Sequence, residues 1–296
     1  MLYDIKLTMR FDYSGLAGGG RHAIRVLPQT LGVHQRMIAG HVDVDPVPRE
    51  RSARTDFFGN PVTDCAFDAI PDDLVYTAQA RVERFAPVHV AADSAILADM
   101  ASELEAARTL LAPSPAHFLN ASALVPPHAG VRDYAQKTTK AAHTIFDAAH
   151  ALNAALHADM RYDAEATDVD TPLAEAFEAR HGVCQDFSHI MIAGLRHLGI
   201  PAAYVSGYLR TIPPKGQPRL EGADAMHAWV SAWCGTKIGW VEFDPTNDLV
   251  VAADHIVVGY GRDYADVPPV RGVIRTAGGQ TATQAVDVLP LDQDLP

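Results

Sequence analysis

The chain has 296 residues, of which 48% are hydrophobic and 20% are charged, and its formal net charge at pH 7 is −12. This composition is that of a folded globular protein long enough for two domains. The acidic balance argues against nucleic acid and anionic membrane surfaces as partners, because like charges repel.

The sequence predicts a cytoplasmic protein without a metal or organic cofactor. No run of apolar residues is long enough for a membrane-spanning helix, and the first residues lack the apolar block of a signal peptide. The three cysteines, Cys65, Cys184 and Cys234, form no CxxC pair, which fits a reducing compartment. The 14 histidines show no metal-ligand spacing. A metal-binding protein that uses these histidines remains an alternative, and it would contain stoichiometric zinc.

Residues 1–90 are predicted to form a small antiparallel β-sandwich domain. In "YDIKLTMRFDY", residues 3–13, apolar and polar side chains alternate strictly, which is typical of a half-buried strand. Weaker alternation follows in "HAIRVLP", "RMIAGHVDVDP" and "LVYTAQARVERF", with turn-forming clusters such as "GLAGGG" and "FFGNPV" between them. No group of catalytic residue types occurs in this region.

Residues 91–296 are predicted to begin with helices. The first covers "AILADMASELEAARTLL", and a long one runs from Asp133 to about Ala158. A short helix follows in "DVDTPLAEAFEAR", with Thr171 as its N-cap and Pro172 as its first residue. The next helix lies in "RHGVCQDFSHIMIAGLRHLGIP", residues 180–201, where apolar residues recur at helical spacing and Gly199 supplies the stop.

Strands are predicted after these helices, in "AAYVSGYL", "MHAWVSAW", "GWVEFDP" and "TQAVDVLPL". Helices first and antiparallel strands later is the α+β pattern. The predicted fold class is therefore α+β, with a core of helices and an antiparallel sheet over residues 91–296.

Cys184 falls at the start of its predicted helix. Unpaired N–H groups and the helix dipole favour negative charge there, and such a position lowers the pKa of a thiol. Free cysteine is also among the most buried residue types, so the helix alone leaves a structural cysteine and a nucleophile both open.

The sequence after this helix supplies a histidine and a carboxylate. In "AMHAWVSAWCGTKIGWVEFDPTN", two alternating strands are joined by a short turn. A turn centred between Gly235 and Thr236 places His227 opposite Asp244, so that the carboxylate can orient the imidazole. An exposed cross-strand pair with no chemical role is the alternative.

The motifs "GVCQDFSHIMIAGLRHLGIPAAYVSGYL", "HAWV" and "GWVEFDPTN" together resemble the bacterial transglutaminase-like proteins of the papain-like cysteine enzyme superfamily. "DFFGN" and the strands around it resemble the β-rich region that precedes their core, and "GRDYADVPPVRGVI" resembles the segment after the Asp motif. The resemblance implies a papain-like core in which Cys184 is the nucleophile, His227 the acid and base, and Asp244 the orienting residue. It implies acyl transfer from a peptide or protein amide, as a peptidase, an amidase or a transglutaminase.

The sequence departs from eukaryotic transglutaminases at the oxyanion site. Those enzymes use a tryptophan upstream of the nucleophile, whereas all three tryptophans here lie downstream of Cys184. Tyr162 is a candidate for the missing oxyanion donor, with packing at a helix end as its alternative role, and Gln185 lies near the site. Asp186 is expected to cap the helix. A transglutaminase-like interaction module without activity is the alternative for the whole protein.

Overall fold

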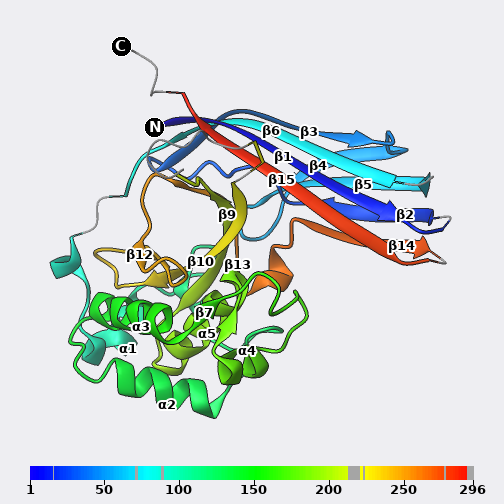
Figure 1. Cartoon of the computed structure of the whole chain (residues 1–296). Coiled ribbons are helices and arrows are strands. Elements are labelled where there is room, and N and C mark those ends of the chain that lie inside the picture. Colours follow the sequence, from blue (N-terminus) through cyan, green and yellow to red (C-terminus); the bar gives the residue numbers. More distant parts are fainter. Residues whose placement is uncertain are drawn as a thin grey trace.

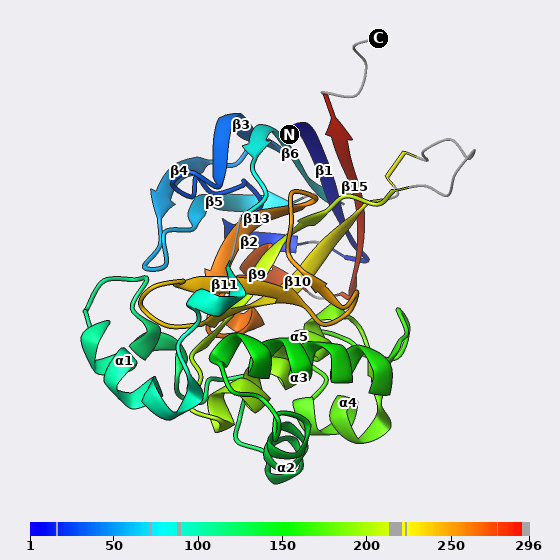
Figure 2. The same cartoon turned by 90° about the vertical axis from the view of Figure 1, so that its left-hand side faces the viewer.

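The computed structural model describes residues 1–15, 17–70, 73–87, 90–212, 221–222, 224–276 and 278–291. In Figure 1 a β-sandwich lies above a central antiparallel sheet, and the helices lie below that sheet. Figure 2 shows the same order of layers after a quarter turn. The predicted mixed α+β class is confirmed, with antiparallel β-sheets first and a core of helices and an antiparallel sheet after them.

Two four-stranded antiparallel sheets form the sandwich. The first has the order β15-β1-β6-β3, from β15 (Gln280–Pro290), β1 (Leu2–Tyr13), β6 (Asp73–Arg84) and β3 (Gln35–Asp45). The second has the order β14-β2-β5-β4, from β14 (Val270–Thr276), β2 (Ala17–Ile24), β5 (Pro61–Ile70) and β4 (Glu50–Thr55). Buried residues of both sheets form one apolar cluster. The alternation predicted for β1 is real, because Tyr3, Ile5 and Leu7 lie in that cluster.

The sandwich contains both ends of the described chain. β15 pairs with β1 and β14 pairs with β2 along most of their length. The sequence analysis assigned everything after residue 90 to the core, and for these two strands that assignment is wrong. Alternation in "TQAVDVLPL" indicates a half-buried strand but not its partner. In the structure Val286 and Val288 are buried in the sandwich cluster.

β4 and β5 were not predicted. All six residues of β4 are exposed, as at a polar sheet edge, and β5 buries adjacent residues instead of alternate ones. β2 begins inside the predicted "GLAGGG" turn, of which Leu16 lies outside the described residues. A Cβ on Gly20 would lie 2.7 Å from the carbonyl oxygen of Val273 in β14, so glycine lets the two backbones approach.

The central sheet has the order β12-β11-β10-β9-β13. Its strands are β9 (Ala202–Leu209), β10 (Ala225–Trp233), β11 (Trp240–Asp244), β12 (Leu249–Val250) and β13 (His255–Gly261). β9, β10 and β11 were predicted, whereas β12 and β13 were not. Successive residues of β10 face opposite sides: Val230 packs among the helices, and Trp229 lies in a separate cluster on the other face.

Five α-helices are present in the described chain: α1 (Met100–Ala106), α2 (Ala129–Thr138), α3 (Ile145–Asp159), α4 (Leu173–Ala179) and α5 (Cys184–His197). None of them combines the length and the apolar character needed to cross a membrane. α1 is shorter than predicted, and α4 begins one residue later, with Pro172 as its N-cap.

The prediction of one helix from Asp133 to Ala158 is wrong, because α2 and α3 are separate. α3 starts at a capping box: the Asp147 N–H donates to Thr144 Oγ1, and the Thr144 N–H donates to the Asp147 carboxylate, both at 3.1 Å. These side chains satisfy N–H groups at the start of a new helix, so the helical conformation is interrupted between residues 139 and 144.

The sandwich is attached to the edge of the central sheet. The Gln35 side chain donates to the carbonyl oxygen of Val257 at 2.7 Å and accepts from the same residue's N–H at 2.9 Å. Asn60 makes the same pair of bonds with Tyr260, at 2.9 and 2.8 Å. Two buried amide side chains thus satisfy backbone groups of edge strand β13.

Candidate functional site

Cys184 is the first residue of α5, as the sequence predicts. The first N–H groups of a helix have no intrahelical acceptor, and the helix dipole favours negative charge at that end. Asp186 caps the turn, because the Val183 N–H donates to its Oδ2 at 2.8 Å. Thr167 Oγ1 donates to the same oxygen at 2.6 Å. The thiol therefore lies at a well-supported helix N-terminus and is partly accessible to solvent.

The hairpin of β10 and β11 has a different register from the prediction. Ser231 lies opposite Glu242 and Trp233 opposite Trp240, a shift of two residues. The loop is longer than expected and reverses through Gly235 at φ 111° and Gly239 at φ 72°, both in the left-handed region. An even shift keeps every side chain on its face, so His227 and Asp244 become diagonal neighbours instead of opposed ones.

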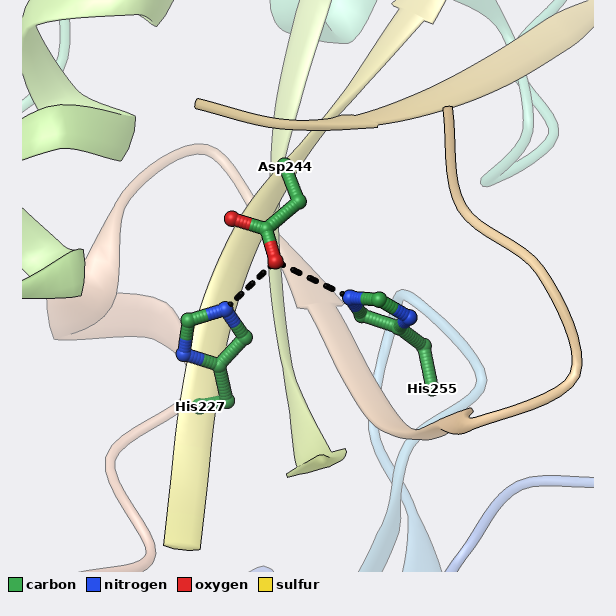
Figure 3. Close-up of side chains that lie close together, drawn as sticks. All are labelled: His227, Asp244 and His255. Carbon is green, nitrogen blue, oxygen red and sulfur yellow. Dashed lines mark hydrogen bonds and ion pairs between the residues drawn. The ribbon is translucent and has the colours of Figure 1, made fainter. Parts of the chain in front are cut away.

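His227 and Asp244 are in contact despite this shift. His227 Nε2 donates to Asp244 Oδ2 at 2.8 Å (Figure 3). Asp244, the last residue of β11, is 0% exposed and His227 is 8% exposed. The alternative of an exposed cross-strand pair is therefore wrong.

Cys184 acts on the His227 ring, because its charge and a side-chain hydrogen bond to it are among the causes that raise the pKa of His227. Because Nε2 is bonded to Asp244, Nδ1 is the ring nitrogen left for Cys184. Burial opposes the charged imidazolium, yet the negative charges of Cys184 and Asp244 and the hydrogen bonds to both raise the pKa of His227 to about 10. The imidazole therefore holds a proton at neutral pH, as a thiolate–imidazolium pair requires.

The Asp244 carboxylate accepts five hydrogen bonds from the described residues. Oδ2 accepts from His227 Nε2 at 2.8 Å, His255 Nε2 at 3.0 Å and Asn247 Nδ2 at 2.7 Å. Oδ1 accepts from the backbone N–H groups of Thr246 at 3.0 Å and Asn247 at 3.2 Å. Burial disfavours the carboxylate, but these donors, with the two histidines first, hold the pKa of Asp244 well below its usual range.

His255 is a site residue that the sequence analysis missed. It is the first residue of β13 and is 2% exposed, and its Nε2 donates to Asp244 on the side away from His227 (Figure 3). No spacing or motif connects residue 255 to the other three. Asn247 was also missed, although "DPTN" placed it three residues after Asp244.

Trp229 packs against both histidines, whose own ring centroids are 6.0 Å apart. Its ring stacks on His227 with centroids 6.1 Å apart, and it meets His255 edge-on at 5.1 Å. The indole Nε1–H donates to Glu242 Oε2 at 3.0 Å. Both imidazoles are therefore oriented by packing as well as by Asp244.

Glu242 connects Trp229 to the sandwich. Its carboxylate accepts from Trp229 Nε1 and, at 2.6 Å, from the hydroxyl of Tyr260. Arg84, the last residue of β6, brings a buried guanidinium to 3.7 Å from Glu242 Oε2. A buried charged network thus extends from the sandwich to the candidate site.

Tyr162 and Gln185 have different surroundings. Tyr162 lies in β7 (Arg161–Tyr162), which pairs with β8 (His181–Gly182) just before Cys184. It is exposed, and burial together with the nearby Cys184 raises its pKa, so its hydroxyl keeps its proton. Gln185 Nε2 instead donates to the carbonyl oxygen of Val169 at 3.1 Å. Gln185 therefore anchors the loop beside the site.

The cluster of His227, Asp244 and His255 has the donor set of a metal site. Their ligand atoms lie within 4.8 Å of one another. Both Nε2 atoms, however, lie at hydrogen-bonding distance from the same Oδ2, at 2.8 and 3.0 Å. A metal would have to replace both N–H protons, and Asp244 already accepts from Asn247 and two backbone groups. The contacts fit a hydrogen-bonded carboxylate better than a metal centre.

An apolar cavity of about 250 Å³ lies elsewhere on the central sheet. Its lining includes Phe58 of the sandwich and Phe118, Trp240 and Tyr260 of the core. None of Cys184, His227 and Asp244 lines it. The site is therefore defined by its side-chain chemistry and not by this cavity.

Two family models match the chain. Residues 132–245, which include Cys184, His227 and Asp244, match the transglutaminase-like superfamily. Residues 3–83 match the bacterial transglutaminase-like N-terminal region. The first segment covers most of α2, all of α3, α4 and α5, and strands β9, β10 and β11 of the central sheet, and the second covers most of the sandwich.

One mycobacterial protein and a crystal structure resemble the chain over most of its length, and a second mycobacterial protein resembles less than half of it. An uncharacterized protein of Mycobacterium tuberculosis is 36% identical over 268 residues, which cover 88% of this chain and 84% of that protein. An uncharacterized protein of Mycobacterium leprae is 40% identical over 129 residues, 42% of this chain and 43% of that protein. A crystal structure from Cytophaga hutchinsonii, described as a "Putative Cysteine Protease", has a TM-score of 0.77 at 20% identity, covering 100% of this chain and 92% of that one. At that identity the structural likeness concerns the fold.

Proposed function

This chain belongs to the transglutaminase-like superfamily, and from that premise we propose that it is a cysteine-dependent enzyme that transfers acyl groups from amide bonds. The observation that carries the proposal is the arrangement of Cys184, His227 and Asp244 at the site. A thiol at a helix N-terminus interacts electrostatically with an imidazole whose Nε2 is bonded to a buried carboxylate. This is the arrangement of an activated nucleophile with an oriented base.

The reaction has two steps. The Cys184 thiolate attacks the carbonyl carbon of an amide, and the C–N bond breaks as the His227 imidazolium gives its proton to the departing nitrogen. This step leaves a thioester on Cys184 and a neutral imidazole. Water or an amine then attacks the thioester, His227 takes up its proton, and the thiolate leaves. The acceptor decides whether the protein acts as a peptidase or amidase, or as a transglutaminase.

The tetrahedral intermediate needs hydrogen-bond donors for its oxygen. The backbone N–H of Cys184 is one, because the first helical residue has no intrahelical acceptor. We assign the second donor to the hydroxyl of Tyr162, which keeps its proton, is exposed and lies near the sulfur. Gln185 supports the adjoining loop through Val169 and has no part in this donor pair.

The direct test uses mass spectrometry of defined peptide mixtures incubated with wild type and with Cys184→Ala. Hydrolysis, deamidation and cross-linking produce different mass changes. We expect at least one of them with wild type and none with the variant. Identical product spectra for both proteins would overturn the proposal.

Alkylation separates an enzyme from an inactive interaction module. We expect iodoacetamide to modify Cys184 much faster than Cys65 and Cys234 near pH 6, because burial raises the pKa of both other thiols, that of Cys234 to about 12. Equal rates for all three cysteines would support the module.

A further inference from the structure

Two histidines donate to one oxygen of Asp244, and the proposed reaction uses only one of them. His227 and His255 place their Nε2 atoms 2.8 and 3.0 Å from Oδ2, from opposite sides (Figure 3). His227 belongs to β10 and His255 to β13, and β9 lies between these strands. The second histidine therefore reaches the carboxylate from a strand that carries none of Cys184, His227 and Asp244.

The two imidazoles differ at their second nitrogen. Asp244 occupies Nε2 of His227, which leaves Nδ1 for Cys184, whereas Nδ1 of His255 is buried and has no hydrogen-bond partner among the described residues. A charged His255 would bury an unpaired N–H beside the His227 imidazolium, which is costly. A neutral His255 with its proton on Nε2 donates to Asp244 and leaves only a lone pair unmatched.

We infer that His255 is a positioning residue, whose Nε2–H holds Oδ2 of Asp244 in line with His227. This inference rests on the proposed function. Asn247 holds Asp244 through its side chain and backbone, and Thr246 through its backbone, all from the following turn. His255 supplies the donor on the far side of Oδ2. Without it, the carboxylate can turn toward Asn247, and His227 loses its fixed acceptor.

The groups around His255 add little other charge. Trp229 packs edge-on against its ring, and Leu209 of β9 lies opposite it in the sheet. The neighbouring Asp254 is engaged by the Tyr3 hydroxyl at 2.9 Å and by Arg210 at 3.3 Å. Within the described part of the chain, Asp244 and His227 are thus the titratable groups that face the His255 ring.

Three substitutions distinguish the effect of the hydrogen-bond donor from the effect of the ring's packing. His255→Gln places an amide N–H at the same number of bonds from Cβ as Nε2, so it can still donate to Asp244. His255→Asn is polar but one bond too short. His255→Phe keeps a ring against Trp229 and lacks the donor.

The experiment measures the pH dependence of Cys184 alkylation by iodoacetamide, which needs no known substrate. Loss of the donor weakens the imidazolium that supports the thiolate. We expect the acidic midpoint of alkylation to rise by about 0.5–1 pH unit in His255→Phe and His255→Asn. In His255→Gln it is expected to stay near the wild-type value. Thermal unfolding of each variant establishes which of them are folded.

Turnover supplies a second readout once a peptide substrate is found. We expect kcat to fall about 10- to 100-fold in His255→Phe with KM unchanged, equivalent to about 1.4–2.8 kcal/mol, because His255 contacts Asp244 and not the substrate. If His255→Phe does not fold, His255→Asn against His255→Gln makes the same comparison.

The outcomes distinguish the inference from the proposed function. A wild-type profile like that of an ordinary thiol, without reactivity near pH 6, would sink the proposed function itself. A reactive wild type with the same midpoint in His255→Asn and His255→Phe would overturn the inference alone. If the alkylation midpoint rises as much in His255→Gln as in His255→Asn, the inference is also overturned. The lost hydrogen-bond donor would then not be the cause of the rise.

Discussion

Replacing Asp244 by asparagine tests the centre of the site. The side chain keeps its size, but one oxygen becomes an NH₂ group. If the amide oxygen stays toward His227 and His255, the NH₂ group meets the backbone N–H groups of Thr246 and Asn247, which lose their acceptor. If the amide is flipped, its NH₂ group faces the Nε2–H groups of His227 and His255, and these two lose their acceptor instead. Either orientation sets donors against donors at a residue that is 0% exposed.

The structure sets the size of the effect. Two donors left without an acceptor beside this buried side chain cost about 1–3 kcal/mol each, so we expect Asp244→Asn to lose about 2–6 kcal/mol of unfolding free energy. The pKa of His227 should fall from about 10 toward its ordinary 6.5, because the charged acceptor is gone. The thiolate–imidazolium pair is weakened with it, and the acidic midpoint of Cys184 alkylation should move to higher pH.

The stability loss should depend on pH in a defined window. The folded-state pKa of Asp244 is depressed, so its contribution is present above the ordinary value of 3.8 and is lost as the pH falls below it. The folded-state pKa of His227 is raised, so its contribution is present below 6.5 and is lost as the pH rises toward about 10. The difference between wild type and Asp244→Asn should therefore be largest between about pH 4 and pH 6.5.

Urea unfolding at several pH values measures this difference. The control is Asp43→Asn, at an exposed carboxylate of the sandwich whose ion pair with His41 lies in solvent, and we expect less than about 1 kcal/mol there. Asp244→Asn with wild-type stability and a wild-type alkylation profile would refute the reasoning, since the buried carboxylate would then not be what orients His227.

Three further substitutions test other parts of the site. His227→Gln should slow Cys184 alkylation at pH 6 by about 10- to 100-fold, measured by peptide mass spectrometry, because the thiolate loses its imidazolium. Tyr162→Phe should lower kcat about 100-fold without changing the melting temperature, since it removes one oxyanion donor at an exposed position; an unchanged kcat would eliminate that role. Arg84→Met should cost about 2–4 kcal/mol in urea unfolding, because Glu242 stays buried without its cation; an unaltered midpoint would contradict the inferred coupling of the sandwich to the core.

The start of α5 could be predicted because its signals are local. A turn before Val183, an aspartate at the third helical position and apolar residues at helical spacing lie within one short stretch. The break between α2 and α3 also had a local signal, Thr144 followed by Asp147, and the prediction passed over it. Local rules therefore located Cys184 at its helix start, even where neighbouring helix boundaries were misplaced.

The contact between His227 and Asp244 was predicted through a register that is wrong. The predicted contact holds because the error was two residues, and the side-chain period of a strand is also two. An error of one residue would have placed the two side chains on opposite faces. The actual register depends on how the loop from residue 234 to 239 closes, and the short-turn rule used for the prediction did not describe that loop.

The sequence by itself determined the periodic elements, the position of Cys184 at a helix N-terminus and the common face of His227 and Asp244. These are short-range properties of backbone geometry and side-chain alternation. Only the tertiary structure decided that β14 and β15 pair with the sandwich, and that His255 reaches Asp244. Strand partners and convergent side chains are selected by burial of the whole chain at once, because each apolar face is stabilised only by the particular face that covers it.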